Sequence, residues 1–186
     1  MNNCQINDYN QFLGVDEFAY NIFEYLFLNE TLWKLIKYDG NDALNPSNAN
    51  LTSAEKIELL WVGDEEDSSG YRVFMQPSTD DAFEDVTTQL RIFERETIPE
   101  SRVVGTVLMC VEILVYNKNN GLKNSKKTRL SAIKSEVIQS LNGVNIKGVG
   151  NLFLDQMGNR KTGAVLSLNN SKNYFGYVIT LATHVG

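Results

Sequence analysis

Three consecutive segments decide the fold: VVGTVLMCVEILVY (residues 103–116), NKNNGLKNSKK (117–127) and TRLSAIKSEVIQSL (128–141). The first is apolar apart from a few positions such as Glu112 and is shorter than the ~20 residues that cross a bilayer, so it predicts a buried strand. The second is a polar, basic loop. The third predicts a helix, because its apolar residues recur at i, i+3, i+7 and i+11: Leu130, Ile133, Val137 and Leu141. The helix is expected to end at Asn142-Gly143, since glycine readily adopts the left-handed conformation past a last turn.

The rest of the C-terminal part reads as a sheet. Further strands are expected at residues 144–155, 163–168 and 174–183, the first of them bent at Gly148 and Gly150. The helix is expected to lay its apolar stripe on one face of the sheet, against Leu108 and Ile113. The predicted class is therefore α+β, a mixed or antiparallel sheet with one long helix packed on a face, plus a helical N-terminal segment.

The N-terminal part predicts helices. Residues 1–62 are expected to form a helical segment and residues 63–186 a ring-forming α+β sheet domain, both sharing one core. Helical spacing of apolar residues predicts two helices within 15–38, joined at Asn29. The capping-box pattern Thr52-Ser53-Ala54-Glu55 predicts a short helix that ends near Trp61. Two strands are expected before the central stretch, at residues 71–76 and 86–95.

Charge divides the chain. Residues 1–100 contain 6 Lys or Arg against 20 Asp or Glu, whereas residues 101–186 contain 11 against 3. Portions of opposite charge favour assembly, often with another copy of the same chain. The net charge of −6 argues against a protein whose main task is to bind duplex nucleic acid. The candidate interface residues are the charged residues of the basic loop, the arginine at the start of the helix that follows it, and an acidic loop: Lys118, Lys123, Lys126, Lys127, Arg129, Asp64, Glu65, Glu66 and Asp67.

No catalytic, metal-binding or cofactor-binding residue is predicted. His184 is the only histidine, and Cys4 and Cys110 lack the spacing of a zinc site. The glycine-rich residues 143–150 follow a helix and lack the Gly-Lys-Ser/Thr ending of a phosphate-binding loop. The carboxylates of residues 80–85 show no sign of the burial that a glycosidase acid needs. We therefore expect a protein that is not an enzyme and binds no cofactor.

The chain also shows no targeting signal. Its polar first residues lack the cationic lead and apolar stretch of a signal peptide. Cys110 is expected to be a small buried hydrophobic residue, and a structural disulfide is not expected. These features indicate a protein made and kept inside a cell, without a membrane anchor.

Several phrases carry a resemblance to a known group. They are YLFLNETLWKLIKY (25–38), the helix RLSAIKSEVI (129–138) that leads into Leu141-Asn142-Gly143, IKGVGNL (146–152) and the closing YFGYVI (174–179). With the long strand and the basic loop in this order, most of the chain resembles the neck and tail-terminator (head-tail joining) proteins of tailed bacteriophages.

The resemblance implies a non-enzymatic virion structural protein, made in the host cytoplasm and located in the neck region. Such a protein forms a ring, usually of six or twelve copies, that joins the head to the tail or terminates the tail. Its partners would be adjoining neck, portal-adaptor or tail-tube proteins, and residues 117–127 would project toward an adjoining ring or the DNA channel. The helical N-terminal segment departs from the smallest terminators, so head closure, neck adaptor and tail terminator stay open.

Two other hypotheses rest on the residues alone. The aromatic N-terminal helices, with Phe27 and Trp33, would let an intracellular adaptor hold a protein partner, unless these rings fill the core. The basic loop would let Lys123, Lys126 and Lys127 contact a nucleic-acid backbone, although it has no interleaved aromatic residues for base stacking.

Overall fold

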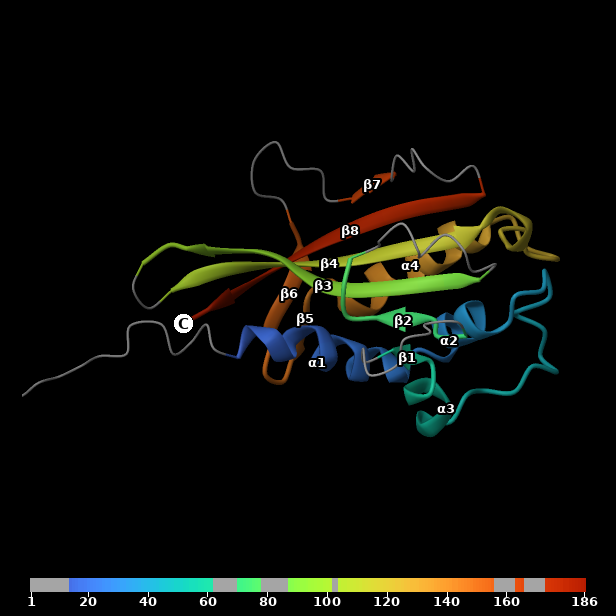
Figure 1. Ribbon diagram of the computed structural model, residues 1–186, viewed down its shortest axis with the longest axis horizontal. Coiled ribbons are helices and arrows are strands. Elements are labelled where there is room, and N and C mark those ends of the chain that lie inside the picture. Colours follow the sequence, from blue (N-terminus) through green and yellow to red (C-terminus); the bar gives the residue numbers. More distant parts are fainter. Residues whose placement is uncertain (1–13, 62–69, 78–86, 102–103, 156–162, 166–172) are drawn as a thin grey trace, which may run out of the picture.

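Three long antiparallel strands form the centre of the protein: β3 (Thr88–Pro99), β4 (Gly105–Tyr116) and β8 (Tyr174–Val185). They run along the long axis of the molecule, with the N-terminal helices on one side (Figure 1). The structure is a computed structural model that describes residues 14–61, 70–77, 87–101, 104–155, 163–165 and 173–186. The predicted strand at 103–116 is confirmed, because the apolar run coincides with β4 from Gly105 onward.

Short strands extend the sheet on both sides: β1 (Leu60–Trp61), β2 (Val73–Phe74), β5 (Val144–Ile146), β6 (Gly150–Leu154) and β7 (Gly163–Val165). The strand order is β1-β2-β3-β4-β8-β6-β5, with β7 also paired to β8. The β1–β2 and β2–β3 pairs are parallel and the others are antiparallel. The sheet is therefore mixed, and the predicted α+β class is confirmed.

The predicted long helix is α4 (Arg129–Leu141), which contacts β4, β8 and the helix α2. Ile133, Val137 and Leu141 are buried, which confirms the apolar stripe. Ile113 lies in the same buried cluster. The expected contact with Leu108 is wrong, because successive side chains of a strand alternate between faces and Leu108 is buried outside that cluster.

Two short helices precede the sheet, as predicted. They are α1 (Phe18–Tyr25), flanked by the 3-10 turns η2 (Val15–Glu17) and η3 (Leu26–Leu28), and α2 (Glu30–Lys37). Asn29 joins them, because its side-chain oxygen accepts from the Leu32 N–H at 2.9 Å and so caps α2. Its amide nitrogen donates to Glu136 and Ser140 of α4 at 3.0 and 2.8 Å. This one residue therefore ties the start of α2 to α4.

The capping box is confirmed at the start of α3 (Ser53–Ile57). The Thr52 hydroxyl accepts from the Glu55 N–H at 3.3 Å, and the Glu55 carboxylate accepts from the Thr52 N–H at 2.7 Å. The expected helix end near Trp61 is wrong, because the chain leaves the helix after Ile57 and pairs as β1 with β2. Pairing with β2 therefore makes residues 60–61 a strand where a continued helix was predicted.

The segment predicted as one bent strand at 144–155 is instead the hairpin of β5 and β6. Gly148 has a φ of +83°, and an added Cβ there would lie 2.9 Å from the Asn21 side chain. The glycine therefore makes a tight turn beside α1 instead of bending a continuous strand. Gly143 has a φ of +80°, which confirms the predicted left-handed end of α4.

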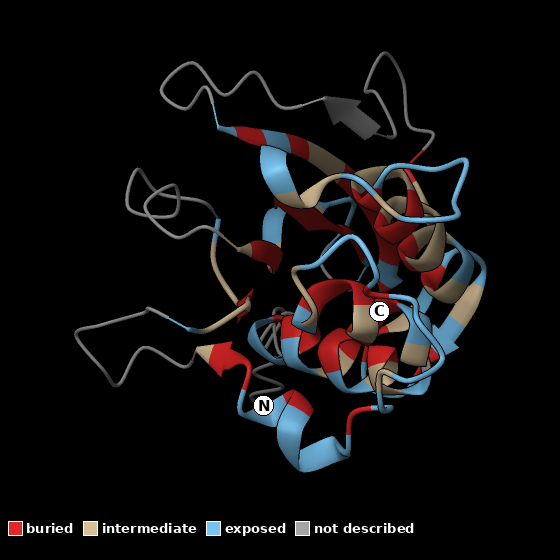
Figure 2. Ribbon diagram, turned by 90° about the vertical axis from the view of Figure 1, so that its right-hand side faces the viewer, coloured by how far each residue is buried: buried red, intermediate tan, exposed pale blue. Residues whose placement is uncertain are grey.

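One cluster of buried apolar residues joins both parts of the chain, from Val15 in η2 to Val185 in β8. Figure 2 shows the buried residues concentrated where the helices meet the sheet. The helices and the sheet thus share one core, and the sheet already begins with β1 inside the segment predicted as helical. No described helix is long and apolar enough to span a membrane.

Candidate functional site: a basic cleft between two loops

The basic loop, defined here as residues 117–128, leaves β4 and returns to α4 at one end of the molecule (Figure 1). Its start is held by a bond from the Asn117 N–H to the Asn173 carbonyl at 2.7 Å. Its middle is held by a bond from the Lys123 N–H to the Asn41 carbonyl at 2.6 Å. The second contact fixes the basic loop against the loop of residues 38–52, which follows α2.

The two loops enclose an open cleft of about 750 Å³, which we call the basic cleft. Lys123, Lys126 and Lys127 line it and are exposed. None of these three takes part in an ion pair with another residue that the structure describes. The remaining lining residues are one acidic residue, Asp42, and the polar or apolar residues Asn41, Leu44, Asn45, Pro46, Leu122, Asn124 and Ser125. The basic cleft therefore combines free positive charge with apolar surface.

Lys118, the fourth predicted lysine, is exposed in the 3-10 turn η5 (Asn117–Asn119) and does not line the basic cleft. The acidic candidates Asp64, Glu65, Glu66 and Asp67 lie outside the described residues, as do the carboxylates of residues 80–85. Of the nine predicted interface residues, the structure therefore brings three together in one site.

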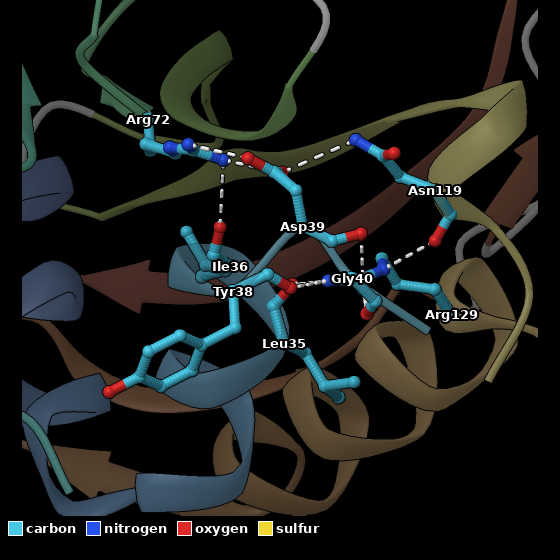
Figure 3. Close-up of polar contacts among 8 residues, drawn as sticks. All are labelled: Leu35, Ile36, Tyr38, Asp39, Gly40, Arg72, Asn119 and Arg129. Carbon is cyan, nitrogen blue, oxygen red and sulfur yellow. Dashed lines mark hydrogen bonds and ion pairs between the residues drawn. The ribbon is translucent and has the colours of Figure 1, made fainter. Parts of the chain in front are cut away.

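Arg129 is a correction to the predicted interface, because it is fully buried. Figure 3 shows its guanidinium turned inward, toward the end of α2. It donates five hydrogen bonds to backbone carbonyls, those of Leu35, Tyr38, Asp39, Gly40 and Asn119. These bonds use all five of its N–H groups, and the one to Leu35 satisfies a carbonyl that the end of α2 leaves unpaired. Burial lowers the pKa of the Arg129 guanidinium, opposed by the nearby Asp39 carboxylate.

A second arginine completes this network, again as Figure 3 shows. The Arg72 guanidinium donates to both carboxylate oxygens of Asp39, at 2.7 and 2.8 Å, and to the Ile36 carbonyl at 3.2 Å. The Asn119 side-chain amide donates to the same Asp39 carboxylate at 3.3 Å. The base of both cleft loops is therefore anchored by paired charges and carbonyl bonds, which fixes the spacing of the cleft walls.

The N-terminus of α4, next to the basic cleft, is already occupied by the protein. The Arg129 and Leu130 N–H groups donate to the carbonyl and side chain of Asn120, at 2.8 and 3.0 Å. The Ser131 N–H donates to the Thr128 hydroxyl at 3.2 Å. Helix N-termini bind anions through N–H groups that have no partner within the protein. The three N–H groups at the start of α4 are already bonded to the protein itself. Binding in the cleft therefore depends on the lysine side chains.

Three aromatic residues of the N-terminal helices, Phe23, Phe27 and Trp33, pack together at the core. Phe23 and Trp33 are fully buried, and their ring centroids lie 5.7 Å apart. Phe27 packs on both rings, and the Trp33 indole N–H donates to the Leu26 carbonyl at 2.8 Å. Trp33 is therefore closed to a partner and Phe27 is half-buried against the core, which argues against the adaptor hypothesis.

His184 has neighbours that the sequence pattern did not reveal. Thr106 on β4 lies directly opposite it on β8, and the hydroxyl of Thr106 lies 3.0 Å from the His184 Nδ1. That hydroxyl has one proton, which it donates to the Glu100 carboxylate at 2.5 Å, so toward His184 it can only accept. A general base must instead accept the proton of the nucleophile. The contact thus ties β4 to β8, and His184 is not the group that accepts the Thr106 proton.

Other reactive groups are buried or isolated. Cys110 is buried on β4, and burial raises the pKa of its thiol. Arg91 is buried on β3, with its guanidinium over the Phe74 ring at 4.2 Å and bonded to the Gln89 side chain and the Pro77 carbonyl. Within the part of the chain that the structure describes, no group of three or more acidic, histidine or cysteine side chains could hold a metal ion. Among the described residues, we therefore take the basic cleft as the candidate functional site, because its charged side chains are exposed to a partner.

Comparison with known proteins gives one match. The model of the YomW family matches residues 29–183, which is most of the chain, so this chain belongs to the YomW family. The family is phage-derived, of the Bacillus prophage type, which makes this a phage-related protein. No curated protein and no solved structure matches the chain.

Proposed function

We propose that this chain, as a member of a phage-derived family, is a non-enzymatic structural subunit of the phage neck. It packs side by side into a ring of six or twelve copies, which joins the head to the tail or terminates the tail. Membership of a phage-derived family supports a role in a phage. The order of the long strand, the basic loop and the helix supports a place in the neck, because phage neck proteins have the same order.

The observation that carries the proposal is the basic cleft on an acidic chain. Three exposed lysines are gathered at one end of a molecule whose net charge is −6. Such a surface attracts the acidic remainder of a second copy. When the two contacting patches differ, the contact is heterologous, and it closes into a ring if the rotation between copies permits.

The first experiment locates the protein. Phage particles that carry the gene are purified and analysed by mass spectrometry, and immunogold electron microscopy marks the chain on intact particles. The expected result is a constant copy number per particle, with gold at the head-tail junction. Absence of the chain from purified particles, or gold confined to the capsid surface or the tail tip, would overturn the neck assignment.

The second experiment tests self-association. Size-exclusion chromatography with light scattering is run at ~50 mM and ~500 mM salt, because the Debye length falls over this range and screens exposed charges. The expected result is a concentration-dependent oligomer at low salt that dissociates at high salt. A strict monomer at every concentration and salt would count against unaided ring formation, and purified neck or tail-tube proteins would then be added as templates.

A second use of the same surface is contact with DNA in the channel, because the exposed lysines could neutralise phosphates. Retention on duplex DNA, measured for the wild type and for Lys123→Glu/Lys126→Glu/Lys127→Glu at increasing salt, separates the two uses. Retention that the triple variant loses would show that the basic cleft contacts the nucleic-acid backbone.

A further inference from the structure

One face of the first helical segment is acidic and carries exposed apolar side chains. It consists of Glu17, Tyr20, Glu24 and Leu28, which follow one another along η2, α1 and η3, and we call it the acidic helix face. Leu28 is 80% exposed and Tyr20 is 42% exposed. Residues 1–33 contain no Lys or Arg, and among the described residues that line the hollow beside Glu17 and Glu24, Lys147 of the β5–β6 turn is the one with a positive charge. Leu28 and Tyr20 thus place exposed apolar surface beside the carboxylates of Glu17 and Glu24.

The protein holds Leu28 in a defined position. Leu26, two residues before it, is fully buried. Asn29, the next residue, is bonded to α2 and to two side chains of α4. Shallow hollows lie on both sides of Leu28, one beside Glu24 and one beside Gln139. A side chain whose backbone is already ordered loses little entropy on binding, so this arrangement suits a docking contact.

The basic cleft has the complementary properties. Leu44, which is 41% exposed, lines it together with Pro46 and Leu122, and the three exposed lysines surround this apolar part. We propose that the acidic helix face of a second copy docks in the basic cleft, with Leu28 against Leu44 and Leu122 and with Glu17 and Glu24 near the lysines. This contact deepens the proposed function, on which it rests, by naming the two surfaces that alternate around the ring.

A protein segment fits this cleft better than a nucleic-acid backbone does. Phosphates would gain nothing from the exposed Leu44 that lines the cleft, whereas the acidic helix face brings the exposed Leu28 together with its carboxylates. The acidic helix face and the basic cleft also occupy different parts of the molecule, since α1 lies beneath the sheet and the two loops that line the cleft lie at one end of it (Figure 1). A contact between them is therefore heterologous, as a ring requires.

The test reverses the charges on each surface separately. Glu17→Lys/Glu24→Lys and Lys123→Glu/Lys126→Glu/Lys127→Glu should each lose the low-salt association of the wild type. An equimolar mixture of the two variants should regain it, because each cleft then meets a face of opposite sign. Leu28→Ser should weaken association roughly tenfold or more, because it removes one large apolar side chain from the contact.

The matched control is Lys118→Glu, which reverses an exposed charge in the same loop but outside the basic cleft and should associate like the wild type. Every substituted side chain is exposed, so thermal unfolding followed by circular dichroism should give nearly unchanged midpoints. A variant that does unfold early is replaced by its single substitutions.

The outcomes separate this inference from the proposed function. The acidic helix face is not the docking surface if the cleft variant loses association while the Glu17/Glu24 and Leu28 variants associate normally. The same holds if the mixture of the two charge-reversed variants fails to associate. In either case the proposed ring would have to form through another acidic surface. A wild-type chain that never self-associates also overturns the inference. The neck assignment is decided independently, by whether purified particles contain the chain.

Discussion

Replacing Arg129 by alanine should destabilise the whole protein, although the residue sits beside a surface loop. Its guanidinium donates five hydrogen bonds to carbonyls at the end of α2 and in η5. Hydrogen bonds to a charged group contribute about 1.5–3 kcal/mol each when buried. Only the bond to the Leu35 carbonyl joins two buried atoms, and water can replace part of the other four. Recovered hydration of the guanidinium offsets more, so the expected loss is about 3 kcal/mol.

The measurement is urea unfolding followed by tryptophan fluorescence, with the free energy of unfolding extrapolated to water. Arg129→Lys should fall between the wild type and Arg129→Ala, because an ammonium group has three donors for the five carbonyls. Lys126→Ala, an exposed neighbour in the same loop, should stay within about 0.5 kcal/mol of the wild type.

One result would refute this reasoning. If Arg129→Ala unfolds within about 1 kcal/mol of the wild type, the five carbonyls are satisfied without the guanidinium. If the same variant also loses self-association, Arg129 acts as the contact residue that the sequence pattern first indicated.

Three further predictions test other parts of the structure. Trp33→Phe removes an indole N–H that bonds a buried carbonyl and leaves a smaller ring, so it should lower the free energy of unfolding by about 2 kcal/mol in urea. Bonds from the Thr52 backbone and hydroxyl hold the pKa of the Glu55 carboxyl below its ordinary value, so the capping carboxylate stabilises the fold at neutral pH and this contribution is lost as the pH falls through the lowered pKa. Glu55→Gln should therefore be less stable than the wild type at pH 7, and the difference in thermal midpoint should shrink below about pH 4. Burial raises the pKa of the Cys110 thiol, so in a Cys4→Ser background it should resist thiol reagents at pH 8 until urea unfolds the protein; rapid labelling of the folded chain would contradict its burial.

The local patterns were predictable because they depend on neighbours in the sequence. The stripe of α4, the glycine at its end and the Thr52–Glu55 capping box each involve residues a few positions apart. The two helices joined at Asn29 belong to the same class. In each case a backbone bond or a repeat of 3.6 residues decides the outcome, and no distant segment changes it.

The candidate site was only partly predictable from the sequence. Counting charges identified the basic loop, but it could not separate Lys126, which is exposed, from Arg129, which is buried. The distinction depends on the end of α2, about 90 positions away along the chain, whose carbonyls need a donor. Trp33 was equally ambiguous, because a stripe of aromatic residues is compatible with a core and with a binding surface.

The sequence by itself determined the α+β class, the long strand and helix, and the opposite charges of the two parts of the chain. Periodicity and composition are local properties that survive any arrangement of the elements. Only the tertiary structure decided that residues 144–154 form a hairpin, that Arg129 is an internal clamp, and that the two loops meet in a basic cleft. These features arise where segments far apart in the chain satisfy each other's backbone groups, and that requirement appears only when the chain is folded.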